Sequence, residues 1–274
     1  MRRPSTSLAC FLLLTFGTAC AHRLAATPEF ALRVMSYNIA AGYGDLSRTT
    51  EAIRVSAADV VALQEVDVHW SARSNFADEA SVLAERLKMD VRFARIYEFP
   101  GADAAAPPRT YGVALLSRYP IVAWHNHMLT RLSTQQDTPP APLPGFLEAT
   151  IDIDGMLVRA FNTHLDYRAD PKVRERQVAE MLAIVGEPST PTLLFGDLNA
   201  PPTAAELQPL LERLHDTWPP SAGPGLTYPA TEPAKRIDYV LTSNHFRVRS
   251  AWVRATDASD HRPVVVDLVT RRSR

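Results

Sequence analysis

Short runs of apolar and β-branched residues dominate this 274-residue chain, and few stretches with helical periodicity separate them. A doubly wound parallel sheet needs a helix between nearly every pair of strands. We therefore expect an α/β fold of two largely antiparallel sheets packed face to face, with helices outside. The dipeptide Asp154-Gly155 predicts a tight hairpin turn, because both residues tolerate positive φ. The predicted strands are Arg33–Ile39, Val60–Glu65, Arg92–Tyr97, Val113–Ser117, Ile121–Leu129, Leu147–Ile153, Met156–His164, Thr192–Phe195, Ile237–Thr242, Arg247–Val253 and Val264–Val269.

Helices are expected in four places between these strands. Two lie near 48–57 and 76–88. Asp170-Pro171 predicts an N-cap and a first helical residue, because the apolar residues that follow repeat with a helical period. Thr203 and Glu206 have the spacing of a capping box ahead of several leucines.

The first twenty residues predict an export signal rather than part of the fold. Arg2 and Arg3 precede a mostly apolar stretch from Leu8 to Ala19, which is too short to span a bilayer but suits a signal peptide. Ordinary cleavage in this region and lipidation of Cys20 both fit the residues around it. We expect the protein in the bacterial periplasm, at the membrane as a lipoprotein, or secreted, with residues 21–274 forming one catalytic domain.

Removal of the leader changes the bulk properties of the chain. Both cysteines, Cys10 and Cys20, lie within residues 1–20, so the mature domain has no internal disulfide. Loss of Arg2 and Arg3 lowers the basic count from 29 to 27 against 30 acidic residues, so the formal charge changes from −1 to −3. This charge is not typical of proteins that rely on nucleic-acid phosphates for affinity.

Polar residues end the apolar runs at six points that are far apart in the sequence. A strand end can deliver polar side chains into a cleft while the body of the sheet stays buried. Together the motifs predict one acidic, imidazole-bearing site, and hence a metal-assisted hydrolase. They are Ser36-Tyr37-Asn38, Leu63-Gln64-Glu65-Val66, Asn162-Thr163-His164-Leu165-Asp166, Gly196-Asp197-Leu198-Asn199, Arg236-Ile237-Asp238-Tyr239 and Ser259-Asp260-His261-Arg262-Pro263.

Strand geometry predicts which of these side chains share a face. Residues i and i+2 point the same way in an extended chain, so Asn162, His164 and Asp166 are expected to project together, as are Asp197 and Asn199. Each motif alone also has a structural interpretation. These alternatives are a solvated carboxylate at Glu65, a turn at Asn38, a hydrogen-bonded histidine at His164, an Asx turn at Asp197, an ion pair between Arg236 and Asp238, and a loop pair at Asp260-His261.

In their order and spacing, the six motifs resemble the endonuclease/exonuclease/phosphatase superfamily. The resemblance runs from about residue 33 to 269. That superfamily includes DNase I, abasic endonucleases, neutral sphingomyelinases and inositol polyphosphate 5-phosphatases. The resemblance implies a four-layer α/β sandwich and divalent-metal-dependent hydrolysis of phosphoester bonds, usually with Mg²⁺.

The resemblance also implies roles for the matching residues. Glu65 resembles the principal metal ligand, with Asn38 and Asp260 helping to hold metal, water or phosphate oxygen. Asp238 resembles the carboxylate that orients His261, the imidazole beside the scissile phosphate.

Three further positions complete the implied site. Asp197 and Asn199 resemble the pair that positions the nucleophilic water and stabilises the transition state. His164 resembles the second imidazole of the DNase I and sphingomyelinase branches, which argues against abasic-site repair. Either Asp197 or His261 could be the general base.

Elementary chemistry supports a metal-dependent reaction. A hard dication such as Mg²⁺, or alternatively Mn²⁺, prefers oxygen ligands and needs few protein carboxylates. The sequence has no Gly-rich phosphate-binding loop and no Cys or His spacing typical of zinc sites. Loops 131–145 and 217–235 are expected to border the cleft and to set specificity. Candidate phosphate contacts beside the motifs are Arg109, Tyr111, Arg168, Lys235 and Arg236.

The sequence thus predicts an exported, metal-dependent phosphodiesterase that acts as a monomer on a small or lipid phosphodiester. A lipid anchor would give it a membrane association. An extracellular nuclease resembling DNase I is the alternative, although the acidic balance disfavours nucleic acid as a partner. A non-catalytic binding protein of the same fold is a further alternative.

Overall fold

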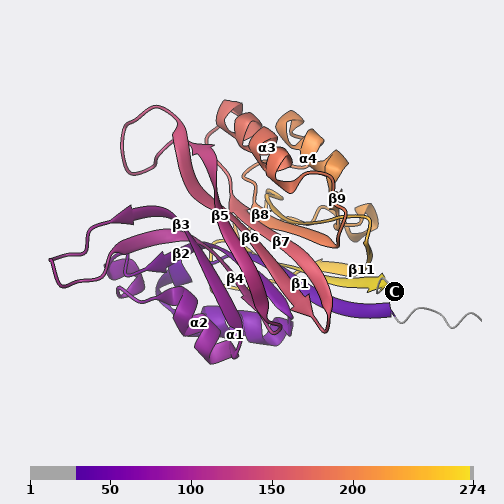
Figure 1. Cartoon of the computed structure of the whole chain (residues 1–274), viewed down its shortest axis with the longest axis horizontal. Helices are drawn as coiled ribbons and strands as arrows, with labels where there is room; N and C mark the ends of the chain where they lie inside the picture. The colour runs from indigo at the N-terminus through magenta and orange to yellow at the C-terminus, as the bar shows by residue number, and fades with distance from the viewer. Residues whose placement is uncertain (1–28, 272–274) are drawn as a thin grey trace, which may run out of the picture.

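The computed structural model describes residues 29–271, so the predicted export signal and Cys20 lie outside the described residues. Within them the strands form two six-stranded sheets (Figure 1). The strands are β1 (Glu29–Asn38), β2 (Val60–Val68), β3 (Asp90–Phe99), β4 (Arg109–Ser117), β5 (Ile121–Arg131), β6 (Ala141–Ile153), β7 (Met156–His164), β8 (Thr192–Asp197), β9 (His215–Asp216), β10 (Asp238–Thr242), β11 (Phe246–Val253) and β12 (Val264–Arg271).

The strand pairing is largely antiparallel, as predicted. The first sheet has the order β11-β12-β1-β2-β4-β3 and the second the order β5-β6-β7-β8-β10-β9. Only β1–β2 and β7–β8 are parallel among these pairs of described strands. The Asp154-Gly155 hairpin is confirmed, because both residues have positive φ and Ile153 pairs with Met156.

Helices cover the outer face of each sheet and complete four layers (Figure 1). Helices α1 (Leu46–Ser56) and α2 (Glu79–Leu87) belong to the first sheet, and α3 (Lys172–Val185) and α4 (Gln208–Arg213) to the second. The predicted α/β sandwich is therefore confirmed. None of the helices in residues 29–271 is long and apolar enough to cross a lipid bilayer.

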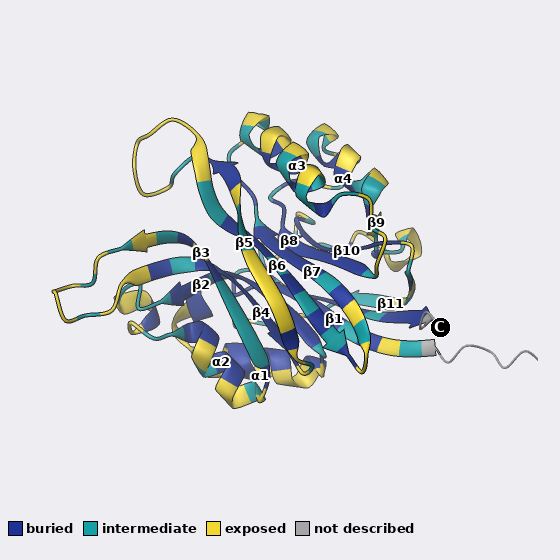
Figure 2. Cartoon of the chain, viewed as in Figure 1, coloured by how far each residue is buried: buried dark blue, intermediate teal, exposed yellow. Residues whose placement is uncertain are grey.

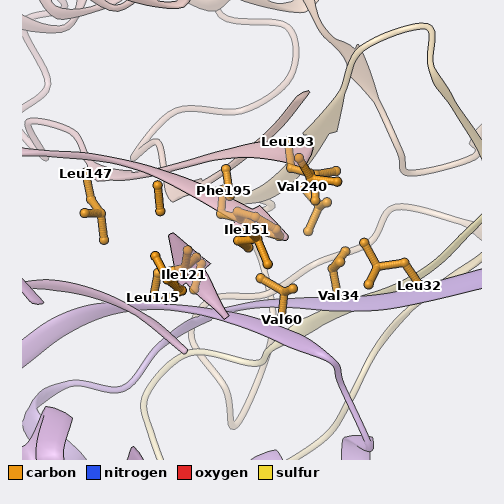
Figure 3. Packing of buried hydrophobic residues seen from close by; sticks show 14 of the residues in the cluster. Leu32, Val34, Val60, Leu115, Ile121, Leu147, Ile151, Leu193, Phe195 and Val240 are labelled. Atoms are coloured by element: carbon orange, nitrogen blue, oxygen red, sulfur yellow. The ribbon is translucent and has the colours of Figure 1, made fainter. Parts of the chain in front are cut away.

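The main core lies between the sheets. Val60, Leu115, Leu147 and Phe195 are fully buried there and point toward one another from opposite sheets (Figure 3). Two further apolar clusters lie under the helix pairs. The central strands are accordingly buried on both faces, whereas exposed residues concentrate on helices, loops and edge strand β5 (Figure 2).

Two helix starts differ from the sequence-based expectation. Asp170 accepts a hydrogen bond from the Lys172 amide at 3.1 Å, but α3 begins one residue after the expected proline. The prediction of a Thr203–Glu206 capping box is wrong, because no side chain within residues 29–271 caps the helix that begins there. Glu206 instead accepts hydrogen bonds from the Arg174 guanidinium at 2.8 and 3.0 Å, so a tertiary ion pair outcompeted the local cap.

The topology places the predicted motifs at one end of the sandwich. The parallel strands β7 and β8 both finish there, with His164 paired to Asp197. Strand β10 runs antiparallel to β8, so its first residue Asp238 also pairs with Asp197. In the other sheet, parallel β1 and β2 place Asn38 beside Gln64. Residues far apart in sequence therefore meet at the same edge.

Candidate active site

Asp197 lies at the centre of this edge and is 1 % exposed. Its Oδ2 atom accepts a hydrogen bond from Asn38 Nδ2 at 3.0 Å. The same oxygen is 3.5 Å from Nε2 of His164 and 3.6 Å from Nε2 of His261. Burial raises the pKa of Asp197 to about 6, Asp238 adds to the rise, and the two imidazoles and Asn38 oppose it. One carboxylate thus joins groups from both sheets.

His261 is held by a buried carboxylate on its other ring nitrogen. Its Nδ1 lies 3.0 Å from Oδ2 of Asp238, which fixes the ring and leaves Nε2 facing Asp197. Burial alone would lower the pKa of His261. The charge and hydrogen bond of Asp238, with Asp197 and Asp260, outweigh burial and raise that pKa to about 10. The imidazole is therefore protonated at neutral pH.

Glu65 reaches the site through an irregularity in β2. The register between β2 and β4 shifts between Leu63 and Val66, and Glu65 itself has φ of 55°. This left-handed conformation is uncommon for a residue with a side chain. Glu65 Oε1 accepts a hydrogen bond from Asn38 Nδ2 at 2.9 Å. Asn38 therefore bridges the carboxylates of Glu65 and Asp197.

The loop before β12 is fixed to β1 by Ser259. The Ser259 hydroxyl donates to the Asn38 carbonyl at 2.8 Å and accepts from the His261 amide at 3.1 Å. The Asp260 carbonyl accepts from the Ala230 amide at 2.6 Å, and the side chain of Asp260 lines the cleft. Ser259 thus holds the loop in place, and the next two residues, Asp260 and His261, belong to the site.

Asn199 both takes part in an Asx turn and places its side chain in the cleft. Its amide donates to Asp197 Oδ1 at 3.0 Å, which is the Asx turn proposed as the alternative. Its φ of 52° then brings its side chain to the cleft, where Nδ2 donates to the Leu165 carbonyl at 3.0 Å. The turn is therefore the means by which Asn199 is positioned.

These groups border a cleft of about 430 Å³, which falls within the size range of small-molecule sites. Both loops expected at its border contribute, with Leu132 and Thr134 from one and Tyr228 and Lys235 from the other. The first loop is shorter than expected, because β5 extends to Arg131 and β6 begins at Ala141. Of the predicted site residues, those lining the cleft are Glu65, Tyr111, His164, Asp197, Asn199, Lys235, Asp260 and His261.

The three arginines predicted to bind phosphate have other partners and are not part of this lining. Arg109 donates to the Pro100 carbonyl at 3.0 Å. Arg168 pairs with Asp166 and donates to two carbonyls of the loop after β5. Arg236 pairs with Asp216. The structure thus does not bring these three arginines into the cleft lining, and each has a carbonyl or carboxylate partner elsewhere.

Asn162 is also not in the cleft, although it was expected to project beside His164. Its Nδ2 donates to the Leu63 and Ala114 carbonyls, both at 2.8 Å, and its Oδ1 accepts from Gln64 Nε2 at 2.7 Å. These bonds connect the two sheets inside the core. Asn162 and Gln64 are therefore structural, whereas Asp166 does line the cleft.

Sequence reasoning missed several cleft residues, among them Tyr97, Arg131 and Tyr228. Arg131 is the last residue of β5, a strand with polar residues at its centre, and it was assigned only to a bordering loop. The Tyr228 ring lies 4.7 Å from the His261 ring, centroid to centroid. Tyr228 lies within a Pro-rich loop and has no comparable pattern around it.

The acidic groups could hold a metal ion. Asp197, Asp238 and His261 form a candidate Asp–Asp–His site, since they offer ligand atoms that lie within 4.8 Å of one another. Asp238 Oδ1 is buried and has no hydrogen-bond partner among the described residues, which fits a polar or charged neighbour there. Glu65 and Asp260 add carboxylates on the side of Asn38. The donor set, rich in oxygen, fits a hard divalent cation.

The fold is a two-sheet sandwich, and its site combines carboxylates with two imidazoles at one end of the sheets. Residues 35–261 match the model of the Endonuclease/Exonuclease/phosphatase family. The chain belongs to this family, as its motifs suggested. Members of the family are phosphoesterase hydrolases that depend on divalent metals.

The chain is also similar to individual proteins and solved structures. The chain is 26 % identical to the uncharacterized protein YbhP of Escherichia coli K12 over 242 residues, covering 80 % of this chain and 87 % of YbhP. The crystal structure of an endonuclease/exonuclease/phosphatase from Beutenbergia cavernae has a TM-score of 0.70 at 27 % identity, covering 88 % of this chain and 72 % of that one. A mannosyl-6-phosphatase of Bacteroides thetaiotaomicron shares the fold, with a TM-score of 0.61 at 19 % identity and coverages of 86 % and 99 %.

Proposed function

We propose that this protein is an exported, Mg²⁺-dependent phosphodiesterase that hydrolyses a small or lipid phosphodiester by attack of water. The observation that carries the proposal is the arrangement around Asp197. Its carboxylate lies 3.5 and 3.6 Å from two imidazoles, one of which is fixed by Asp238 at 3.0 Å. This arrangement can orient a water molecule and manage its proton beside a phosphate.

The pKa directions favour a division of roles between Asp197 and His261. His261 has the higher pKa, so the proton resides on the imidazole and Asp197 is mostly ionised at neutral pH. We infer that Asp197, with Asn199, orients and deprotonates the water. The imidazolium of His261 stabilises charge on the phosphoryl oxygens and gives a proton to the leaving oxygen. His164 contributes a second imidazole near the same oxygen of Asp197.

The residues proposed to hold the cation are Glu65, Asn38 and Asp260. A divalent cation bound there supplies neutralisation of phosphate charge. Mg²⁺ prefers oxygen ligands over imidazole nitrogen, which favours these residues over the Asp–Asp–His set. In that set, Nδ1 of His261 is already hydrogen-bonded to Asp238. Mn²⁺ is an alternative occupant.

The cleft supports a small or lipid substrate over duplex DNA. It is of small-molecule size, and its lining combines apolar side chains such as Ile96 and Leu132 with tyrosines. Arg131 and Lys235 are the basic residues of the lining. A groove that follows a nucleic-acid backbone needs a more extended basic surface. The predicted export signal and Cys20 would place the enzyme near an envelope surface.

A substrate panel at several salt concentrations tests the proposal. Purified protein is assayed with Mg²⁺ against bis(p-nitrophenyl) phosphate, sphingomyelin, phosphatidylcholine, inositol phosphates and duplex DNA. We expect turnover of a small or lipid diester to exceed DNA cleavage and to tolerate salt. DNA cleavage without turnover of the other esters, and with a steep dependence on salt, would indicate a nuclease. For a nuclease, the logarithm of the DNA-binding constant should fall by roughly 0.9 per neutralised phosphate for each tenfold rise in salt concentration. No turnover of any ester would favour a binding protein.

A further inference from the structure

Arg131 is a buried cation in the wall of the cleft and has no role in the mechanism above. It is 6 % exposed and stands at the end of β5. Its guanidinium donates to the carbonyls of Pro144, Gly145 and His164 at 3.1, 3.0 and 2.7 Å. Burial lowers its pKa to about 10, and the nearby Tyr97, Tyr111, Asp166 and Glu180 act in the opposite direction, so it is charged at neutral pH.

Carbonyl groups satisfy some of the hydrogen bonds of Arg131 but not its charge. A guanidinium has five N–H donors, and these three acceptors leave donors free. Among residues 29–271, no carboxylate forms an ion pair with Arg131. Arg174 provides the contrast, because it is equally buried and is neutralised by Glu206. A buried charge without a counterion is costly, and Arg131 is the buried arginine that lines the cleft.

Two tyrosines extend the donor surface beside Arg131. Tyr97 and Tyr111 line the same cleft with ring centroids 6.1 Å apart. The Tyr97 oxygen accepts hydrogen bonds from the amide and hydroxyl of Thr134 at 3.1 and 3.3 Å, so its own proton is free to be donated. The cleft lining therefore includes these donors as well as the carboxylates of Glu65, Asp166, Asp197 and Asp260.

We propose that Arg131, with the Tyr97 and Tyr111 hydroxyls, forms an anion subsite that binds an anionic group of the substrate other than the phosphate being hydrolysed. The substrate class is then a phosphoester that carries a second phosphate or carboxylate. This inference rests on the proposed phosphoesterase function for its substrate, but the subsite itself is a binding property. The bound anion would form a direct ion pair with Arg131, which Asp166 and Glu180 do not form although both raise its pKa.

Binding of inorganic phosphate to the full-length protein in EDTA tests the subsite without any requirement for catalysis. Without a cation the carboxylates of the cleft repel anions, so any phosphate binding must come from its donors. Calorimetry on the wild-type protein should detect phosphate binding, and Arg131→Gln should weaken it at least about 10-fold, or 1.4 kcal/mol. Arg131→Lys should retain part of the affinity, because lysine keeps the charge without the planar fork.

Control variants separate a binding role from a structural one. Arg174→Gln should lower the melting temperature but leave the phosphate Kd unchanged, and Arg118→Gln on the surface should alter neither. If Arg131→Gln does not fold, Tyr97→Phe still tests the subsite and should weaken phosphate binding several-fold. The proposal is overturned if folded Arg131→Gln or Tyr97→Phe binds phosphate like wild type. It is equally overturned if the wild-type protein shows no binding up to about 10 mM.

Matched substrates then identify the source of the anion. One pair is thymidine 3′-(p-nitrophenyl phosphate) with and without a 5′-phosphate, and the other is phosphatidylinositol 4-phosphate against phosphatidylinositol. In at least one pair, kcat/KM should be higher for the member with the additional phosphate, and Arg131→Gln should abolish that preference. An equal loss for both members of each pair would contradict the subsite. Phosphate binding that depends on Arg131 in a protein without esterase activity would refute only the proposed function.

Discussion

Nε2 of His261 lies 3.6 Å from Oδ2 of Asp197, although 63 residues of chain separate them. The carboxylate comes from the end of a buried strand, and the imidazole from the loop before β12 in the other sheet. Their approach therefore joins the two sheets at the site. It also sets the charge state proposed for each group, a protonated imidazole beside an ionised carboxylate.

Removing either group should abolish most of the turnover. We expect Asp197→Asn and His261→Ala each to lower kcat on bis(p-nitrophenyl) phosphate by at least about 10²-fold, the usual scale for general acid–base groups. His125→Ala, an exposed histidine on β5, is the matched control and should keep wild-type turnover. Circular dichroism checks folding. A folded His261→Ala variant with near wild-type turnover would refute the proposed site.

Asp238 acts through His261, so its removal should change the pH profile as well as the rate. Asp238→Asn removes the charge that raises the pKa of His261. The imidazole then loses its proton at lower pH, and the alkaline limb of kcat should move toward lower pH. The drop in kcat at neutral pH should be smaller than for His261→Ala, because the imidazole remains. An unchanged profile would show that Asp238 does not control this proton.

Activity should depend on a divalent cation. We expect EDTA to abolish turnover, and Mg²⁺ or Mn²⁺ to restore it, because the predicted ligands are carboxylate and amide oxygens. Glu65→Gln should raise the Mg²⁺ concentration needed for half-maximal activity, whereas the exposed Glu51→Gln should not. Full activity in excess chelator would remove the metal from the mechanism.

Glu79 should make the stability of the fold depend on pH. It is 2 % exposed, and burial raises its pKa from 4.5 to about 8, although the Asp67 amide donates to it. The folded protein therefore retains a proton that the unfolded chain releases. The contribution of protonated Glu79 to the free energy of unfolding is fully present below pH 4.5 and is lost as the pH rises to about 8.

Glu79→Gln removes this titration and should raise the melting temperature at pH 8 more than at pH 5. Glu85→Gln, exposed on the same helix, should leave the pH dependence of melting as in wild type. Parallel melting curves for Glu79→Gln and wild type at both pH values would contradict the prediction.

Local pattern was sufficient for most of the architecture. The period of two along β7 and the Asp154-Gly155 turn predicted the hairpin, because strand alternation and positive φ depend on neighbouring residues alone. The Thr203–Glu206 pattern did not form a capping box, because Glu206 instead forms an ion pair with the buried guanidinium of Arg174. A capping hydrogen bond contributes less free energy than an unpaired buried charge would cost.

The sequence by itself determined the fold class and the family, and it identified which acids, amides and imidazoles could form a site. Their residue types and their order along the chain were enough for this. Only the tertiary structure decided which side chains face the cleft. Asn162 and His164 share a strand face, yet one bridges the sheets and the other reaches Asp197. The guanidinium groups of Arg131 and Arg236 both lie near a motif, yet of these two only Arg236 forms an ion pair with a carboxylate. Partners of this kind come from distant segments, and strand packing rather than sequence spacing sets their distances.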